Sequence, residues 1–510
     1  MTTAKFVQGS IMRHIMVMSS TAAVGISALF VVDLIDIFFL SLLGEQELAA
    51  AVGYAGTISF FTTSIGIGLS IALGALVSRS IGAKDHETAK RLLLNSAIVT
   101  LLMSLVVSAI VTTFIPEMLS LVGAKGHTAE LAADYLYILV PSLPFICLAM
   151  ALGAALRAVG DAKLSMMSTL AGGGVNLVLD PIFIFALSMG IEGAAVASVF
   201  ARLAVLIIAA RGVIVKHKLF GQFNMPHFIA DLKPIFAIAG PAMMTNIATP
   251  IGNAVVTRAI ADFGDGYVAG WAVIGRIIPV SFGMIFALSG AIGPIVGQNF
   301  GAHEFDRVKE SLTKALQFCA LYVIVVSLIL MSLQEQIVSV FDMKGDSAEI
   351  IRFFCTYIAV FFVFSGALFV SNASFNNLGK AKYSTFFNVG KATVGTIPFV
   401  YFGAKWGGVE GVLIGQSIGG IIFGILGVIT AFYWLEKVRV TTLSESVELS
   451  SDEEKAKFRA QQELDADMSP SSPNPLSSSC AQMAQISEEQ DCEASNKVTD
   501  LLKVSDNKAS

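Results

Sequence analysis

Three carboxylates stand inside long apolar stretches of this sequence, where charged side chains are uncommon. Asp33 and Asp36 share one apolar run near the N-terminus, and Asp180 lies in another. A charged group at the centre of a lipid bilayer costs about 2.5–3.5 kcal/mol on insertion scales, so such residues mark ion paths, proton relays or substrate sites. These carboxylates are therefore the first candidates for chemistry.

Two of the carboxylates fall at one depth if their runs are helices that cross a membrane. At 1.5 Å per residue, Asp36 lies about 12 Å from the predicted outer surface, Asp180 about 10 Å and Ser198 about 8 Å. Asn176 is one turn away from Asp180 on the same helix face. The sequence thus predicts one polar layer in the outer half of the membrane.

The oxygen atoms of this layer indicate its chemistry. Pro181 has no N–H to donate to the carbonyl of Leu177, which leaves that oxygen free. Carboxylate, amide, hydroxyl and carbonyl oxygens suit a proton or a hard cation such as Na⁺. We predict a cation-coupling site with no cofactor, no catalytic residue and no metal other than Na⁺. Its members are Asp36, Asn176, Asp180 and Ser198.

Other charged residues in the runs have accessory or structural interpretations. Asp33 is either a second cation ligand or a partner of Arg202, and the layer could also consist of groups that cap one another or pair with Arg202. Helix-packing ion pairs are an alternative for Arg202 and Arg276. Lys391 is the one charged residue of its span, which favours a lining or gating role.

The composition identifies the elements that position these residues. The chain has 510 residues, of which 55% are hydrophobic and 14% charged, and its mean hydropathy is +0.74. Soluble proteins carry roughly 25% charged residues. A soluble enzyme, a disordered protein and a nucleic-acid binder are therefore excluded, and a polytopic all-α membrane protein is predicted.

Twelve apolar runs are long enough to cross the bilayer as helices. With the N-terminus in the cytoplasm, 19 Lys and Arg side chains of residues 1–440 fall in cytoplasmic segments and four in outer loops. This asymmetry predicts that both termini are cytoplasmic. The runs are Ile15–Leu43, Val52–Val77, Leu92–Ile115, Tyr135–Leu156, Leu164–Leu187, Gly193–Val213, Ile235–Ala261, Val268–Gly297, Ala315–Leu333, Phe353–Val370, Ser384–Gly403 and Val409–Leu435.

The two halves of the chain repeat each other at an offset of 218–219 residues. Ser80–Ala83 matches Asn299–Ala302, and Val159–Lys163 matches Leu378–Lys382. Six helices in each half give parallel repeats related by a pseudo-two-fold axis along the membrane normal. The second half does not duplicate the polar layer, because Gly395 and Phe399 occupy the positions that match Asn176 and Asp180.

The repeat predicts the domain organisation. We expect a six-helix lobe at residues 1–215, a cytoplasmic linker at 216–234, a second six-helix lobe at 235–437 and an acidic, disordered cytoplasmic tail at 438–510. A short helix is conceivable within the tail near Glu453–Asp467.

Several functions lack their sequence signatures. The chain contains no phosphate loop of the GxxxxGK[ST] type, no HExxH motif and no pair of CxxC motifs, and its five cysteines read as free thiols. Its six histidines lie at or near span ends or in loops. A membrane enzyme or receptor would need a catalytic or metal constellation, so we predict that the protein is not an enzyme.

Three motifs resemble the multidrug and toxic compound extrusion (MATE) family. They are Asp36–Gly44, Gly297–Ala302, and Asn176-x-x-x-Asp180-Pro181 followed by Gly193–Ser198. The resemblance covers about residues 10–437, and the pattern of acidic residues is similar to the DinF-like branch. It implies a plasma-membrane antiporter, a monomer that exports organic cations or drugs in exchange for inward H⁺ or Na⁺.

One departure from the family pattern concerns the first helix. The family usually has a proline early in this helix, whereas the position here that matches Pro241 is Thr21. A proline-bending mechanism is therefore not expected. The alternative function is a flippase for lipid-linked oligosaccharides or lipids of similar topology, which the basic residues Arg202, Arg276 and Lys391 would serve.

Overall fold

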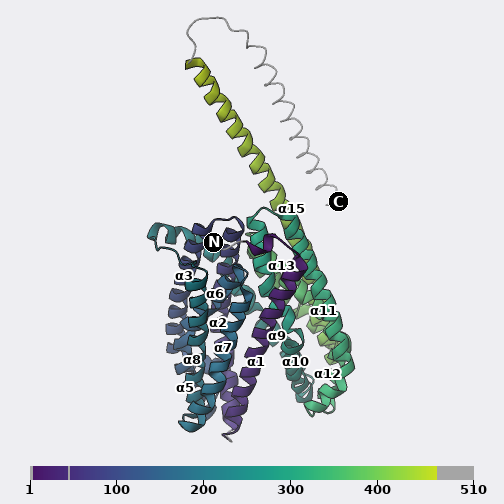
Figure 1. Ribbon diagram of the computed structural model, residues 1–510. Coiled ribbons are helices and arrows are strands. Elements are labelled where there is room, and N and C mark those ends of the chain that lie inside the picture. The colour runs from purple at the N-terminus through teal and green to yellow at the C-terminus, as the bar shows by residue number, and fades with distance from the viewer. Residues whose placement is uncertain (1–3, 44–45, 468–510) are drawn as a thin grey trace. The chain divides into compact units, whose positions relative to one another are not determined.

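The computed structural model describes the backbone of residues 4–43 and 46–467 (Figure 1). The chain divides into two compact units, residues 1–431 and 432–510. All secondary structure in the described ranges is helical. The all-α prediction is therefore confirmed.

The first half of the chain makes six crossings. Three are single helices, and three are helices continued by a short 3₁₀ or π segment (η). They are α1 (Ile11–Ser41), α2 (Gln46–Gly82), α3 (His86–Thr113), α5 (Gly126–Leu139) with η2 (Val140–Ser142) and α6 (Leu143–Ala158), α7 (Ala162–Pro181) with η3 (Ile182–Ala186), and α8 (Gly190–Arg211) with η4 (Gly212–Lys216). Two short elements, η1 (Lys5–Val7) and α4 (Ile115–Leu121), lie outside the crossings.

The second half makes the other six. Its elements are α9 (Met225–Ala261), α10 (Asp265–Gly301), α11 (Phe305–Val340), α12 (Asp346–Phe353) continued through η5 (Phe354–Ile358) and η6 (Ala359–Phe361) into α13 (Phe362–Asn377), α14 (Lys382–Ala392), and α15 (Ile397–Asp467).

The long helix α15 contains a reversal. Gly408 has φ 59° and ψ −144°, outside the helical region. A Cβ on Gly403 would overlap the carbonyl oxygen of Gly411, and a Cβ on Gly419 would overlap that of Gly395. These contacts pair residues on either side of Gly408 as in a helical hairpin. The eleven long apolar stretches found in the described residues thus make twelve crossings.

The backbone confirms the internal repeat. Left-handed conformations recur at the predicted offset: Lys84 (φ 60°) matches His303 (φ 59°), and Gly160 (φ 77°) matches Gly379 (φ 72°). Gly126 (φ 57°) likewise has a counterpart 219 residues on, with φ 55°. Side chains rarely adopt this conformation without a reason. The two lobes therefore share the geometry of their turns as well as the order of their helices.

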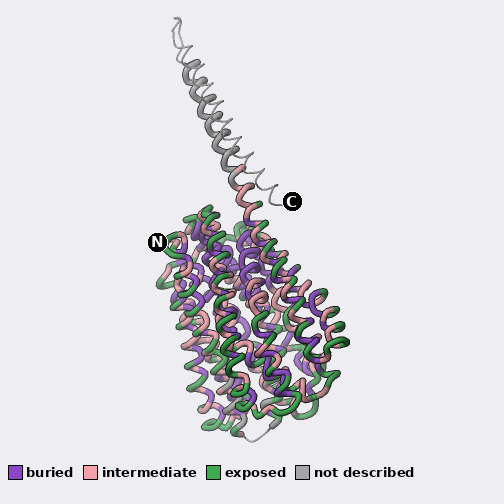
Figure 2. Tube along the Cα trace, turned by 90° about the vertical axis from the view of Figure 1, so that its right-hand side faces the viewer, coloured by how far each residue is buried: buried purple, intermediate pink, exposed green. Residues whose placement is uncertain are grey.

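The helices pack within and between the lobes. α2 contacts α3 and α6, and α1 contacts α7, in the first lobe; α10 contacts α11 and α13 in the second. Across the lobes, α1 packs against α10, and α2 packs against α9 and α10. Figure 2 shows buried and exposed positions alternating along these helices. Exposed apolar residues such as Leu321 and Val280 suit contact with lipid.

The predicted linker and the predicted tail both contain helical residues in the structure. α9 begins at Met225, inside the predicted linker 216–234, because Pro226 suits a first helical turn and Asn224 caps it by accepting from the His227 N–H at 3.3 Å. The helix α15 continues to Asp467, through the stretch of the predicted tail that includes Glu453–Asp467. Residues 468–510 of the tail lie outside the described residues.

Candidate functional site

Two of the predicted carboxylates share one amide. The side-chain nitrogen of Asn176 donates to Asp36 Oδ1 at 2.8 Å and to Asp180 Oδ2 at 2.8 Å. Asn176 and Asp180 are buried on α7, with 3% and 0% of their surfaces exposed, and Asp36 is partly exposed on α1. The predicted contact between the first and fifth crossings is therefore present, and the amide holds both carboxylates at one point.

The end of α7 leaves one carboxylate oxygen without a hydrogen-bond partner among the described residues. Pro181 cannot bond to the Leu177 carbonyl, and the N–H of Ile182 bonds to the carbonyl of Leu179 instead. The π-helical segment η3 follows at once, a distortion often found at functional sites. Asp180 Oδ1 is buried and has no hydrogen-bond partner among the described residues. An unpaired buried carboxylate oxygen is a free ligand atom for a proton or a cation.

Tyr135, on α5, is a further polar residue near the cluster that the sequence did not single out. Its phenol lies within electrostatic range of Asp36, Asp180 and Arg202, and Ser198 lies beside it. The predicted span begins at Tyr135, whereas α5 begins nine residues earlier, which puts Tyr135 about 14 Å from the start of the helix. The phenol adds a hydroxyl to the predicted polar layer.

Arg202 has a local structural role. Its Nη1 donates to the Leu139 carbonyl at 3.1 Å and to Ser142 Oγ at 2.9 Å. These acceptors lie where α5 gives way to η2, because Pro141 interrupts the hydrogen-bonding pattern of the backbone. A cation at the C-terminal end of α5 is also favoured by the helix dipole. The side chain of Asp33 lies outside the described residues.

The other two accessory candidates lie in the second lobe. Arg276 is exposed on α10, and Lys391 on α14 donates to Ser365 Oγ at 3.0 Å. Neither joins the carboxylate pair. Among the described residues, no group of three or more His, Cys, Asp and Glu side chains could hold a metal ion.

The lobes meet closely at one end, which we call the basic end and define by the turns at 83–85, 159–161, 302–304 and 378–381. A Cβ on Gly82 would overlap the Gln298 carbonyl oxygen, and a Cβ on Gly301 would overlap that of Arg79. At the offset of 219, Gly82 corresponds to Gly301 and Arg79 to Gln298, so the repeat relates each of these contacts to the other. A pseudo-two-fold axis therefore passes between α2 and α10, and glycine at both positions brings the backbones together.

Residues 5–9, here called the N-terminal strap, lie against this junction. The Phe6 N–H donates to Gln298 Oε1 at 2.9 Å, and Asn299 Nδ2 donates to the Phe6 carbonyl at 3.2 Å. Arg307 Nη2 donates to the carbonyls of Phe6 and Gly9 at 3.0 and 3.1 Å. The strap thus adds polar contacts between the lobes at the basic end.

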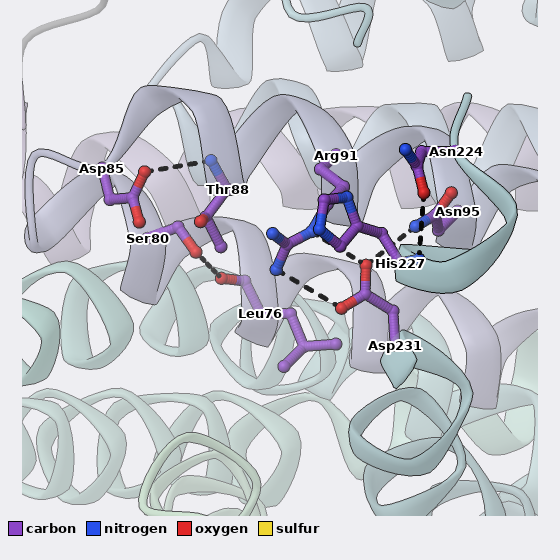
Figure 3. A network of polar contacts seen from close by, with 9 residues as sticks. All are labelled: Leu76, Ser80, Asp85, Thr88, Arg91, Asn95, Asn224, His227 and Asp231. Carbon is purple, nitrogen blue, oxygen red and sulfur yellow. Dashed lines mark hydrogen bonds and ion pairs between the residues drawn. The ribbon is translucent and has the colours of Figure 1, made fainter. Parts of the chain in front are cut away.

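A second polar network joins the lobes near that end. Arg91 and Asn95 of α3 point toward Asp231 of α9 (Figure 3). Arg91 Nε lies 3.1 Å from Asp231 Oδ2, and Asn95 Nδ2 lies 2.8 Å from the same oxygen. Asp231 is 5% exposed, so this ion pair is screened from solvent. It fixes the first turns of the second lobe against the first lobe.

Comparisons with known proteins agree with this architecture. A model of the MatE family matches residues 22–182 and 241–402. The chain is 26% identical to an FAD transporter of Shewanella oneidensis over 84% of this chain and 96% of that protein. It is 24% identical to the multidrug export protein MepA of Staphylococcus haemolyticus, over 80% and 90% respectively.

Two solved structures show the same fold. A MOP superfamily transporter from Pyrococcus furiosus, described as having a binding pocket of reverse polarity, aligns with a TM-score of 0.80 at 22% identity, over 86% of this chain and 99% of that one. An outward-facing multidrug resistance MATE transporter aligns equally well, with a TM-score of 0.80 at 23% identity and the same coverage.

Proposed function

Because the chain belongs to the MatE family of multidrug and toxic compound extrusion transporters, we propose that it is a secondary antiporter. It exports organic cations and drugs and takes up H⁺ or Na⁺ in exchange. The family consists of multi-pass membrane transporters that handle small-molecule drugs. The proposal adds the coupling ion, the organic-cation class, a monomeric state and a plasma-membrane location with both termini in the cytoplasm. The assignment to the DinF-like branch stays a prediction.

The bridged carboxylates carry this proposal. Asp36 and Asp180 meet at the Asn176 amide, and Asp180 is fully buried. Two like charges at this separation in a low-dielectric environment repel each other, so binding one cation relieves the repulsion. Entry of the ion stabilises one arrangement of the first lobe, and its release stabilises another. That difference can drive alternating access of the two lobes.

The geometry favours a proton over Na⁺ as the coupling ion. Asn176 turns its nitrogen, not its oxygen, toward both carboxylates. A proton needs one carboxylate oxygen, such as Asp180 Oδ1, and leaves the amide in place. Na⁺ needs several oxygens together, so the amide must first rotate. Na⁺ can occupy the same site after that rotation.

The flippase alternative receives less support. A lipid-linked pyrophosphate would need a cluster of basic side chains, but Arg202 is held by Leu139 and Ser142 in the first lobe. Lys391 belongs to the second lobe and Arg276 is exposed on α10. These three cations do not form one cluster with a shared acceptor among the residues that the structure describes.

Purified protein in liposomes tests the coupling ion. Ethidium efflux is measured with a pH gradient alone, a Na⁺ gradient alone and neither. We expect efflux with the pH gradient in Na⁺-free buffer. Efflux that requires Na⁺ would reject the proton assignment and keep the site. Efflux that ignores both gradients would reject antiport itself.

A further inference from the structure

The second lobe contains a partly buried cation that the coupling mechanism does not use. Lys391 lies one turn before the break at 393–396 that separates α14 from α15. Its Nζ donates to Ser365 Oγ on α13 at 3.0 Å. An ammonium group has three N–H donors. No ion pair to Lys391 is found among the described residues, and the spans of this lobe contain no Asp or Glu at comparable depth.

The internal repeat shows that Lys391 has no charged counterpart in the first lobe. The position that matches Lys391 in the first lobe is Gly172, and the position that matches Arg202 is Gly420. In each lobe, one of these two matched helices carries a long cation and the other carries a glycine. The cation lies on α8 in the first lobe and on α14 in the second. A Cβ on Gly420 would lie 3.9 Å from Lys391 Cε, so the glycine leaves room beside the lysine.

The two cations differ in their hydrogen-bond acceptors. Arg202 neutralises a helix end through a backbone carbonyl and a hydroxyl. Among the residues that the structure describes, Lys391 bonds to one neutral hydroxyl, and it remains partly exposed in the middle of its span. A cation at this depth is costly without a counter-charge. An acidic group on a bound molecule would supply that charge.

Aromatic rings line the same face of α13 as Ser365. Phe362 and Phe369 are three residues before and four residues after Ser365, so all three side chains share a helix face. Phe286 of α10 packs against both rings, with centroid distances of 5.8 Å to Phe362 and 5.6 Å to Phe369. All three rings are partly exposed. They offer flat apolar surface on the helix face that carries Ser365, the hydrogen-bond partner of Lys391.

We propose that Lys391 and these rings form a substrate site for aromatic molecules that carry an acidic group, such as a phosphate monoester. The ammonium pairs with the acid, and the rings stack on the aromatic part. The proposal rests on the proposed efflux function and adds a substrate class to it. It places this class in the second lobe, away from the carboxylates that bind the coupling ion.

Flavin binding tests the site without transport. Flavin mononucleotide and riboflavin share one ring system and differ in the phosphate. Their binding to the full-length protein in lipid nanodiscs is followed by flavin fluorescence, with no ion gradient. We expect wild-type protein to bind the mononucleotide roughly tenfold more tightly, about 1.4 kcal/mol. Lys391→Gln should abolish that preference, and Lys391→Arg should retain it.

Two further variants separate the ring contact from the charge. Phe362→Leu should weaken both flavins by similar factors, since it removes stacking surface and no charge. Lys405→Gln makes the same charge change as Lys391→Gln at an exposed position and should leave both affinities unchanged.

The proposal has clear contrary outcomes. Equal affinity of wild-type protein for the two flavins, no binding of either, or a preference that survives in Lys391→Gln would each overturn it. If Lys391→Gln does not fold, the wild-type comparison still decides. Failure of the antiport experiment leaves this equilibrium test unaffected, so the two proposals fail independently.

Discussion

At the fifth crossing of the first lobe, Asn176 and Asp180 face Asp36 of the first crossing. At the matching crossing of the second lobe, Gly395 and Phe399 take their places. The carbonyl oxygen of Gly395 lies where a Cβ on Gly419 would be, so the two helices touch through their backbones. The first lobe thus has a polar layer between its helices at this depth, and the second lobe has direct contact between helix backbones instead.

The first crossings of the lobes differ as well. α1 runs without a break from Ile11 to Ser41, and Thr21 bonds to the Val17 carbonyl within the helix. Its counterpart α9 contains Pro234, Pro241 and Pro250. The Pro241 carbonyl accepts from the Thr385 hydroxyl of α14 at 2.7 Å, which ties this part of α9 to α14. The same backbone plan therefore supports a charged first lobe and a proline-rich second lobe.

The largest expected effect comes from the carboxylates of the first lobe. Asp180→Asn should reduce proton-coupled ethidium efflux to the level of protein-free liposomes, because an amide cannot take up and release the coupling ion. Asp36→Asn should do the same. Efflux rates, with membrane insertion checked by size-exclusion chromatography, provide the measurement.

Asp262→Asn is the matched control for these variants. It removes an exposed carboxylate at the end of α9 and should leave efflux unchanged. Full export by both Asp36→Asn and Asp180→Asn would show that coupling resides elsewhere, and the contrast between the lobes would lose its functional meaning.

A smaller effect is expected from the closed contact in the second lobe. Gly419→Ala should destabilise the protein by about 1–3 kcal/mol, because the added methyl meets the Gly395 carbonyl. The matched position in the first lobe is Ala201, where Ala201→Gly should cost about 0.5–1 kcal/mol through helix propensity. Melting temperatures of the two purified variants test the difference. Equal losses would mean that the lobes pack alike at this layer.

A pH-dependent effect is expected at Asp161, in the turn before α7. Burial raises the pKa of this carboxyl, but bonds to Lys216 at 2.7 Å and His217 at 2.8 Å lower it more, so the pKa lies below its usual value. A depressed pKa stabilises the folded state above the unfolded pKa, and the stabilisation is lost as pH falls through the folded pKa.

The variant Asp161→Asn tests this sign. It should lower stability by about 1 kcal/mol near pH 7, partly because Asp161 also caps α7. The gap between wild type and variant should narrow as the pH falls below the usual aspartate range. In the second lobe Lys380 holds the matching position, so no such dependence is expected there. A gap that widens on acidification would contradict the assignment.

The smallest effect is expected from the tail. A chain stopped after Arg439 should insert and transport like the full-length protein, because both lobes precede this point. Efflux normalised to the amount of inserted protein is the measurement. Loss of transport at normal protein levels would show that residues 440–510 contribute to function.

The twelve crossings were predictable because a bilayer demands about 20 apolar residues for each helix. The meeting of Asp36, Asn176 and Asp180 was predictable too, since depth and helix face limit where such costly groups can lie. The role of Tyr135 was not, because a tyrosine near a helix end is ordinary in a membrane protein. Nor were the partners of Arg202, which depend on how Pro141 redirects a single turn.

The residues of the strap show the same limit. Phe6 and Gly9 precede the first helix and carry no recognisable motif. Their backbone groups bond to Gln298, Asn299 and Arg307 in the far half of the chain, and no local pattern reports such contacts. The start of α9 inside the predicted linker shows the same limit, because its first turns contact a distant pair, Arg91 and Asn95.

The strap also orders the events of biosynthesis. The Phe6 N–H finds its acceptor 292 residues further along the chain, and Arg307 is 301 residues away. Residues 5–9 therefore cannot complete these contacts until the ninth crossing, which contains Arg307, has begun. Docking of the strap would come late and would require both lobes to be inserted in register. The contacts of the strap are thus available only to chains whose two halves have already come together.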